Sequence, residues 1–252
     1  MKNKRIIAWW LSILGSTLLR AQEGPKQSFE ATSTEHVNFL PGGTIRVDHS
    51  YGHLTVEGWD EPEVVITVIK STNDFYQPDQ KEQAVERFKK VRVVTERRSD
   101  KELAISTTVP SHHIKFVTPN RKAGVTLEYR VLVPRNSRLE VRHDTGYVWV
   151  SDVTGDLEVR SHTGDMIVML PDPGRYAIDA RTRMGNITSD FAGKSGNRLL
   201  VGLVGSHLSY AREAPSRRIF LRMGAGCITI KQGPPSGPLS RSDLPDGGRA
   251  PE

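Results

Sequence analysis

A short pattern that ends in a glycine recurs four times in the second half of this 252-residue chain. In each copy, apolar residues stand seven and five positions before the glycine, and an arginine stands four positions before it. The copies cover residues 139–146, 157–164, 178–185 and 219–226. Apolar residues return two and four positions after each glycine, except that Ser189 takes the second place in the third copy. Strict alternation is typical of β-strands, and repetition at a nearly fixed interval is typical of strands that stack on one another.

The repeat predicts an all-β fold, either a parallel β-solenoid or a closely related stack of short strands. The repeat glycines Gly146, Gly164, Gly185, Gly205 and Gly226 are 18, 21, 20 and 21 residues apart. Glycine suits the corners of such a stack because it tolerates positive φ and close backbone approach. Gly205 keeps the spacing, but His207 and Ser209 stand where inward apolar residues are expected. We therefore expect that copy to be bulged or looped out.

The first half of the chain contains one weaker copy of the pattern and one helix. Residues 44–56 flank Gly52 in the same way, although Asp48 replaces the arginine. A continuous β-branched run at 64–69 predicts a strand covered on both faces. A capping box predicts a short helix over 78–90. The apolar face of this helix consists of Ala84, Val85 and Phe88. Further strands are expected at 91–96, 103–107 and 125–133.

The N-terminal 21 residues have the composition of a signal peptide. A basic start precedes an uncharged, mostly apolar run of 14 residues, which is short for a membrane span. We expect cleavage near Ala21, and the alternative is an uncleaved N-terminal anchor. The remaining boundaries are a leader at 22–40, a β-strand-repeat domain at 41–231 with its clearest repeats at 139–231, and a disordered Pro/Gly-rich tail at 232–252. Such a protein is exported to the periplasm, the cell surface or the extracellular space, with no transmembrane span after cleavage.

Charge and cysteine content limit the partners. Removal of the four basic residues in 1–21 from the 35 of the whole chain leaves 31 basic against 29 acidic residues, a net charge of +2. A general nucleic-acid-binding role therefore loses its main support. Cys227 is the only cysteine, so an intramolecular disulfide is impossible, and we expect this residue to be buried or half-buried.

The candidate binding residues lie on the outer face of the expected stack. Residues two apart on a strand share a face, so Glu140 and Arg142 both point away from the core. If the copies stack in register, the arginines form one row and the carboxylates a parallel row. The candidates are Arg142, Arg160, Arg181, Arg222, Glu140 and Glu158. A salt-bridged, solvated face is the ordinary structural explanation. The functional hypothesis is a surface that binds an acidic glycan or a partner protein, because arginine binds carboxylates bidentately.

Catalytic, metal and cofactor sites have little support in the sequence. Asp156 and Asp165 repeat a Thr-Gly-Asp step that a carbohydrate-cleaving enzyme could use, but turn chemistry explains both aspartates without catalysis. His49 and His53 are four residues apart across a glycine turn, so their rings need not converge on a metal ion. No nucleotide fingerprint or serine elbow occurs in a suitable context. We therefore expect no catalytic residue, no metal and no cofactor.

These segments together resemble the bacterial putative adhesin family of exported β-strand-repeat domains. The resemblance spans roughly 41–231 and rests on 43–47, 51–60, 127–134 and the repeats that end at Gly146, Gly164 and Gly185. It implies a right-handed parallel β-helix and a location in the cell envelope or at the surface. No catalytic residues are defined for that family.

The first functional hypothesis is thus an exported, non-catalytic protein that binds a surface polysaccharide or another envelope component through the outer face of its solenoid. The alternatives are a carbohydrate-active enzyme on a β-helix and a scaffold or regulatory module that binds an envelope protein.

Overall fold

The computed structural model describes residues 28–73, 76, 81–108, 124–171, 175–200 and 203–234. The expected signal peptide and nearly all of the expected tail lie outside these residues. The described residues form fourteen β-strands and one helix. The first-half elements are β1 (Glu30–Asn38), β2 (Thr44–Trp59), β3 (Glu63–Thr72), α1 (Lys81–Lys89), β4 (Arg92–Ser99), β5 (Glu102–Thr108) and β6 (Val125–Pro134). The second-half elements are β7 (Arg138–Ser151), β8 (Leu157–Pro171), β9 (Tyr176–Met184), β10 (Ile187–Ser189), β11 (Lys194–Leu200), β12 (Leu203–Ala211), β13 (Arg217–Ala225) and β14 (Ile228–Gly233).

Five glycines form a column of corners, as the repeat predicts. Each glycine has positive φ, from 109° at Gly52 to 136° at Gly226. A β-carbon on Gly146 would lie 2.0 Å from the carbonyl oxygen of Gly52, and one on Gly164 would lie 1.7 Å from that of Gly146. Only glycine therefore fits both the backbone conformation and the space. The column runs in the order Gly52, Gly146, Gly164, Gly226 and Gly185.

Each corner also reverses which residues point inward. In β7, Leu139 and Val141 are buried before the glycine, whereas Val148 and Val150 are buried after it. The bend divides the sheet into two layers that enclose the apolar core. The first layer contains, in order, β4, β5, the first half of β2, the first halves of β7 and β8, then β13, β9, β12 and β11. The second layer contains β1, β3, β6, the second halves of β2, β7 and β8, then β14 and β10.

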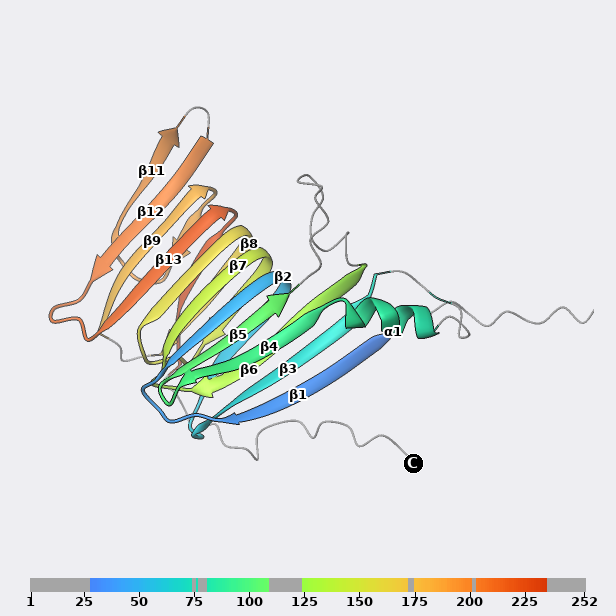
Figure 1. Cartoon of the computed structure of the whole chain (residues 1–252). Helices are drawn as coiled ribbons and strands as arrows, with labels where there is room; N and C mark the ends of the chain where they lie inside the picture. The colour runs from blue at the N-terminus through green and yellow to red at the C-terminus, as the bar shows by residue number, and fades with distance from the viewer. Residues whose placement is uncertain are drawn as a thin grey trace, which may run out of the picture.

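The all-β fold with one short helix is confirmed, and its central strands β2, β7, β8, β13 and β9 stack in parallel (Figure 1). A regular right-handed parallel β-helix is not confirmed. The stacking order departs from the chain order because β13 pairs with both β8 and β9. The sheet is mixed, since β1, β3, β4, β11 and β12 make antiparallel pairs.

The segment around Gly205 is not a bulged copy of the repeat. It belongs to β12, which pairs antiparallel with β9 and forms a hairpin with β11. Because Leu208 pairs with the buried Ala180 and His207 pairs with the exposed Arg181, Ser206 and Leu208 are buried, while His207 and Ser209 are not. The prediction of a bulged or looped-out copy was therefore wrong.

The helix and the cysteine each correct part of the sequence analysis. Helix α1 buries Ala84 and Phe88, whereas Val85, at the edge of the same face, is 39% exposed. The Nζ of Lys70 donates to the carbonyl oxygens of Phe88 and Val91, which fixes the C-terminal end of the helix against β3. Cys227 is exposed rather than buried, because it directly follows a corner glycine at the outer surface. No helix in the described part of the chain is long and apolar enough to cross a membrane.

Candidate functional site

Strand register brings the four predicted arginines into one row on the outer face of the first layer. Arg142 pairs with Arg160, Arg160 pairs with Arg222, and Arg222 pairs with Arg181. Neighbouring strands lie about 4.8 Å apart, so the row places a guanidinium-bearing residue on four successive strands. The insertion of β13 between β8 and β9 puts Arg222 in the third place, ahead of Arg181. We call these four residues the arginine row.

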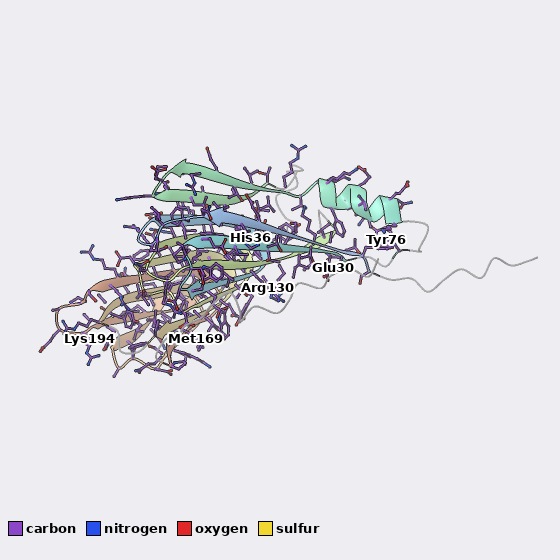
Figure 2. All side chains as sticks on the ribbon, turned by 90° about the horizontal axis from the view of Figure 1, so that it is seen from below. Glu30, His36, Tyr76, Arg130, Met169 and Lys194 are labelled. Carbon is purple, nitrogen blue, oxygen red and sulfur yellow. The ribbon has the colours of Figure 1, made fainter. Side chains whose placement is uncertain are left out.

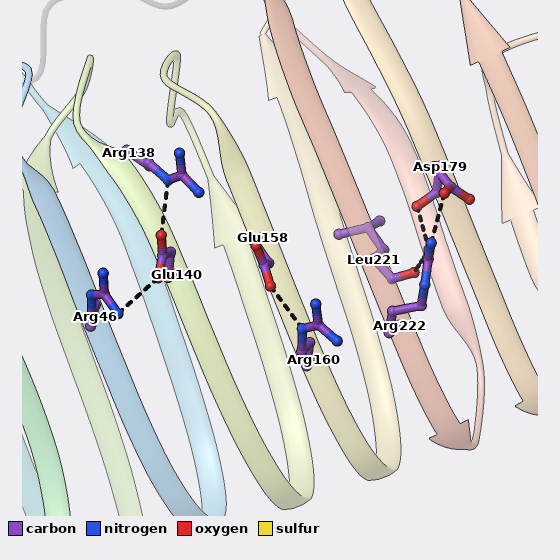
Figure 3. Close-up of polar contacts among 8 residues, drawn as sticks. All are labelled: Arg46, Arg138, Glu140, Glu158, Arg160, Asp179, Leu221 and Arg222. Atoms are coloured by element: carbon purple, nitrogen blue, oxygen red, sulfur yellow. Dashed lines mark hydrogen bonds and ion pairs between the residues drawn. The ribbon is translucent and has the colours of Figure 1, made fainter.

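A parallel acidic row lies two residues earlier on the same strands. Glu140 pairs with Glu158, Glu158 pairs with Phe220, and Phe220 pairs with Asp179. Phe220 thus interrupts the carboxylates at the third place. Figure 3 shows this face, with Glu158 beside Arg160 and with Glu140 beside Arg138 and Arg46.

Two of the three carboxylates in this row, Glu158 and Asp179, each accept a hydrogen bond from the Nε atom of an arginine of the arginine row. The Nε of Arg160 donates to Glu158 at 2.7 Å, and the Nε of Arg181 donates to Asp179 at 3.2 Å. In the described part of the chain, the Nη atoms of Arg160 and Arg181 donate no hydrogen bond to the protein. The two side chains are 53% and 56% exposed. Each pair therefore orients a guanidinium and leaves its outer edge available to a ligand.

Glu140 belongs to a different set of contacts. It accepts a hydrogen bond from the Nε of Arg138 at 2.9 Å and forms an ion pair with Arg46 at 3.5 Å. Arg142, its neighbour on β7, is exposed and has no hydrogen bond or ion pair with another described residue. Its cross-strand neighbour on β2 is Asp48, which makes no ion pair with it, so the Arg142 guanidinium is not held by a described carboxylate.

Arg222 is held much more tightly than the rest of the row. One Nη atom donates to the carbonyl oxygens of Asp179 and Leu221, and the other donates to the Asp179 carboxylate at 2.6 Å. Its guanidinium lies 3.5 Å from the ring centroid of Phe220, and the side chain is 23% exposed. Burial raises the pKa of Asp179, but the hydrogen bonds and charges of Arg222 and Arg181 outweigh this effect and hold the pKa below its ordinary value. Arg222 therefore braces the face and offers little to a ligand.

An open groove follows the arginine row across the strands. We call it the arginine groove; its volume is about 610 Å³. Its lining residues are Arg142, His143, Asp144, Arg160, Ser161, His162, Arg181, Thr182, Arg183, Arg222, Met223 and Gly224. Five arginines and one aspartate are thus among the lining residues, so the groove concentrates positive potential. This arrangement can bind an anionic ligand.

All six predicted binding residues lie on this face, and the sequence analysis missed Phe220 and Arg183. Phe220 stands where the other copies carry an acid, so the break in that pattern was a signal. Arg183 corresponds to Asp144 and His162 in other copies, and no pattern singled it out. Glu140 and Glu158 do not line the groove; they border it through the acidic row.

The two aspartates of the Thr-Gly-Asp steps make structural contacts. A carboxylate oxygen of Asp156 accepts a hydrogen bond from the backbone N–H of Arg218 at 2.8 Å. The corresponding oxygen of Asp165 accepts one from the backbone N–H of Cys227 at 3.1 Å. The Asp156 contact joins the residue before β8 to the start of β13. The Asp165 contact joins β8 to a residue between β13 and β14.

The histidines near the first corner separate as the sequence analysis expects. His49 is buried and His53 is exposed, so the two rings point to opposite sides of β2. His49 instead stacks on His143 inside the core, with ring centroids 4.9 Å apart. Within the described ranges, no three His, Cys, Asp or Glu side chains gather so that they could hold a metal ion.

Comparison with known proteins gives structural similarities only. Neither a protein-family model nor a curated protein sequence matches the chain. A putative cell adhesion protein from Clostridium sporogenes ATCC 15579 is 16% identical, with 82% of this chain and 100% of that chain covered and a TM-score of 0.49. A putative adhesin from Bacteroides fragilis NCTC 9343 is 8% identical, with 79% and 97% covered and a TM-score of 0.30. A putative adhesin from Parabacteroides merdae ATCC 43184 is 10% identical, with 63% and 67% covered and a TM-score of 0.23. Each of these three solved structures is described as a putative adhesin or a putative cell adhesion protein.

Proposed function

We propose that this chain is an exported, non-catalytic adhesin of the cell envelope or surface, and that its arginine groove binds the carboxylates of an acidic glycan. The observation that carries the proposal is the charge of the groove, in which five arginines face one aspartate. The basic, apolar start of the chain supports export.

The geometry of the arginines supports a carboxylate ligand. A guanidinium presents two parallel N–H groups that match the two oxygens of a carboxylate. Glu158 and Asp179 already bind arginines of the row along the Nε edge. The same chemistry remains available on the outer edge of Arg160, of Arg181 and of Arg142, which is unpaired among the described residues.

A non-catalytic role is supported by the contacts of the aspartates considered for glycoside cleavage. Asp156 and Asp165 each accept a backbone hydrogen bond that joins neighbouring strands. Neither aspartate lines the arginine groove. These two carboxylates therefore stabilise the fold. Asp144 is the one carboxylate among the residues that line the arginine groove.

Co-sedimentation with isolated polysaccharide fractions tests the proposal. The purified protein is mixed with an insoluble acidic polysaccharide and with the same polysaccharide after chemical reduction of its carboxyl groups. We expect retention on the acidic form only, and we expect Arg142→Ala combined with Arg160→Ala to abolish it. Soluble sugar is measured in the same tubes. Sugar release would contradict the non-catalytic role, and absence of retention on every acidic fraction would contradict the glycan ligand.

Arg130→Ala is the matched control for these variants. Arg130 lies on β6 in the second layer (labelled in Figure 2), and its Nε donates to Glu128 at 2.7 Å, the same distance as in the Arg160–Glu158 pair. It is 60% exposed and does not line the arginine groove. A loss of retention that is specific to the groove must therefore spare Arg130→Ala.

A further inference from the structure

We infer that the ligand of the arginine groove is a linear polyuronate that lies across the strands, with carboxylates over Arg142, Arg160 and Arg181. This inference rests on the proposed function and specifies the length and direction of the ligand. It follows from the register of the arginines, from their differing partners and from the acidic row beside them.

The first step concerns length. Arg142 is on β7, Arg160 is on β8 and Arg181 is on β9, with β13 between the last two. Three strand spacings of about 4.8 Å separate the ends of this row, a span of roughly 14 Å. One carboxylate can contact only one of these positions. A chain of linked uronic acids can contact all of them, because a linked pyranose ring advances by a distance close to one strand spacing.

The second step concerns direction. The strands that carry the row run parallel to one another, and the row crosses them. The groove includes residues from β7, β8, β9 and β13, so it also crosses them. A polymer in the groove therefore lies along the stacking direction, as Figure 3 allows the reader to follow from Glu140 to Asp179.

The third step concerns the distribution of charge on the ligand. Glu140, Glu158 and Asp179 form the acidic row that borders the arginine row. A ligand with anionic groups on all sides would bring some of them against these carboxylates. A polyuronate can turn one edge of carboxylates toward the arginines and present hydroxyl groups to the acidic row, where carboxylate oxygens accept their hydrogen bonds. The acidic row thus disfavours a duplex nucleic acid and fixes the polymer over the arginines.

The fourth step separates the roles within the row. Arg222 is bound by Asp179 and by two backbone carbonyls, and it covers Phe220. The third position of the row therefore contributes little to binding. The free guanidinium edges are those of Arg142, Arg160 and Arg181, which places two adjacent contacts at one end of the groove and one contact at the other end.

The test measures the affinity of the purified protein for oligogalacturonates of one to eight residues. We expect the affinity to rise by about tenfold for each further arginine contacted, and to level off once the oligomer spans the row, at about four to five residues. Arg181→Ala should lower tetramer affinity by about tenfold while leaving dimer affinity almost unchanged, because the dimer can occupy the Arg142–Arg160 end. Arg130→Ala should leave the whole series unchanged.

Several outcomes would overturn the inference. A monomer that binds as tightly as the tetramer would refute the extended ligand while leaving a carboxylate-binding groove in place. Equal binding of duplex DNA at matched charge would refute the discrimination by the acidic row. If no oligomer and no polyuronate binds, both the proposed function and the inference fail.

Discussion

The Nδ1 atoms of His49 and His143 lie 3.0 Å apart inside the core, on neighbouring strands of the stack. The Nδ1 of His143 also lies 3.2 Å from the carbonyl oxygen of His49. A carbonyl oxygen only accepts, so the proton is on Nδ1 of His143 and the Nδ1 of His49 is the acceptor. The contact therefore requires the His49 ring to be neutral, because its Nδ1 must keep a lone pair to accept the hydrogen bond.

This pair predicts a loss of stability in mild acid. Burial, followed by the charge of His143, lowers the pKa of His49 to about 3, and burial lowers the pKa of His143 to about 4. Both pKa values lie below the ordinary histidine value of 6.5, so below pH 6.5 the unfolded chain binds protons that the folded chain excludes. The stabilisation is complete above about pH 6.5 and declines as the pH falls toward about 4. Between about pH 6.5 and pH 5 we expect a loss on the order of 2 kcal/mol for each histidine.

Urea unfolding at about pH 7.5 and pH 5 measures this effect. The comparison variant replaces His49 with Phe and His143 with Leu, which removes both titrating rings and keeps the positions apolar. We expect its unfolding free energy to change much less between the two pH values than that of the wild type. An equal change in both proteins would show that other groups cause the acid sensitivity.

The corner column predicts a steep cost for a methyl group at Gly146. An alanine there must adopt a φ near 132° and place its β-carbon 2.0 Å from a backbone oxygen. Gly42 has a φ of 84°, but a β-carbon added there would meet no atom within 4 Å. We expect Gly42→Ala to cost about 1–2 kcal/mol from conformation alone, and Gly146→Ala to cost roughly 3 kcal/mol or more, since the backbone must also shift. Similar unfolding midpoints for the two variants would contradict the close packing of the column.

The unequal partners within the arginine row predict opposite phenotypes for two similar substitutions. Arg222→Ala removes hydrogen bonds to Asp179 and Leu221 and the contact with Phe220. We expect it to lower stability by about 1–3 kcal/mol and to change ligand affinity little. Arg142→Ala should lower ligand affinity and change stability little, because Arg142 is exposed and unpaired among the described residues. Thermal unfolding and binding measured on both proteins decide this, and a stability loss in Arg142→Ala alone would reverse the assignment.

The turn contacts predict how the two aspartates respond to substitution. Asn retains a side-chain oxygen that can accept the backbone N–H bonds of Asp156 and Asp165, whereas Ala does not. We expect the Asn variants to be close to wild type in stability and the Ala variants to lose about 1 kcal/mol each. Polysaccharide retention should survive in all four variants. A sugar-releasing activity that Asn abolishes would restore the enzymatic hypothesis.

Periodicity explains why the corners and the arginine row could be predicted from the sequence. The alternation before each glycine sets which residues point outward, and the common offset aligns residues such as Arg142 and Arg160 once the strands stack. The order of the stack could not be predicted in this way. Copies with the same pattern fit beside one another in any order. In the structure β13 lies between β8 and β9, and the antiparallel hairpin of β11 and β12 lies on the other side of β9.

The same limit applies to the site. The sequence offered Arg222 as an equal member of the row. The structure shows that Phe220 and Asp179 hold it, and the Arg222–Asp179 pair joins strands at positions 43 residues apart in the chain. Arg183 lines the groove for a similar reason. Its strand, β9, lies next to β13, which carries Arg222, and not next to β8.

Equilibrium binding of a soluble polyuronate to the wild type, to Arg160→Ala and to Arg130→Ala tests the central claim most directly. On opposite layers of the fold, the Nε of each arginine donates to the carboxylate two residues earlier at 2.7 Å. We predict that Arg160→Ala weakens binding by about tenfold and that Arg130→Ala binds as the wild type does. Equal affinities for all three proteins, or an equal loss in both variants, would contradict a binding site in the arginine groove.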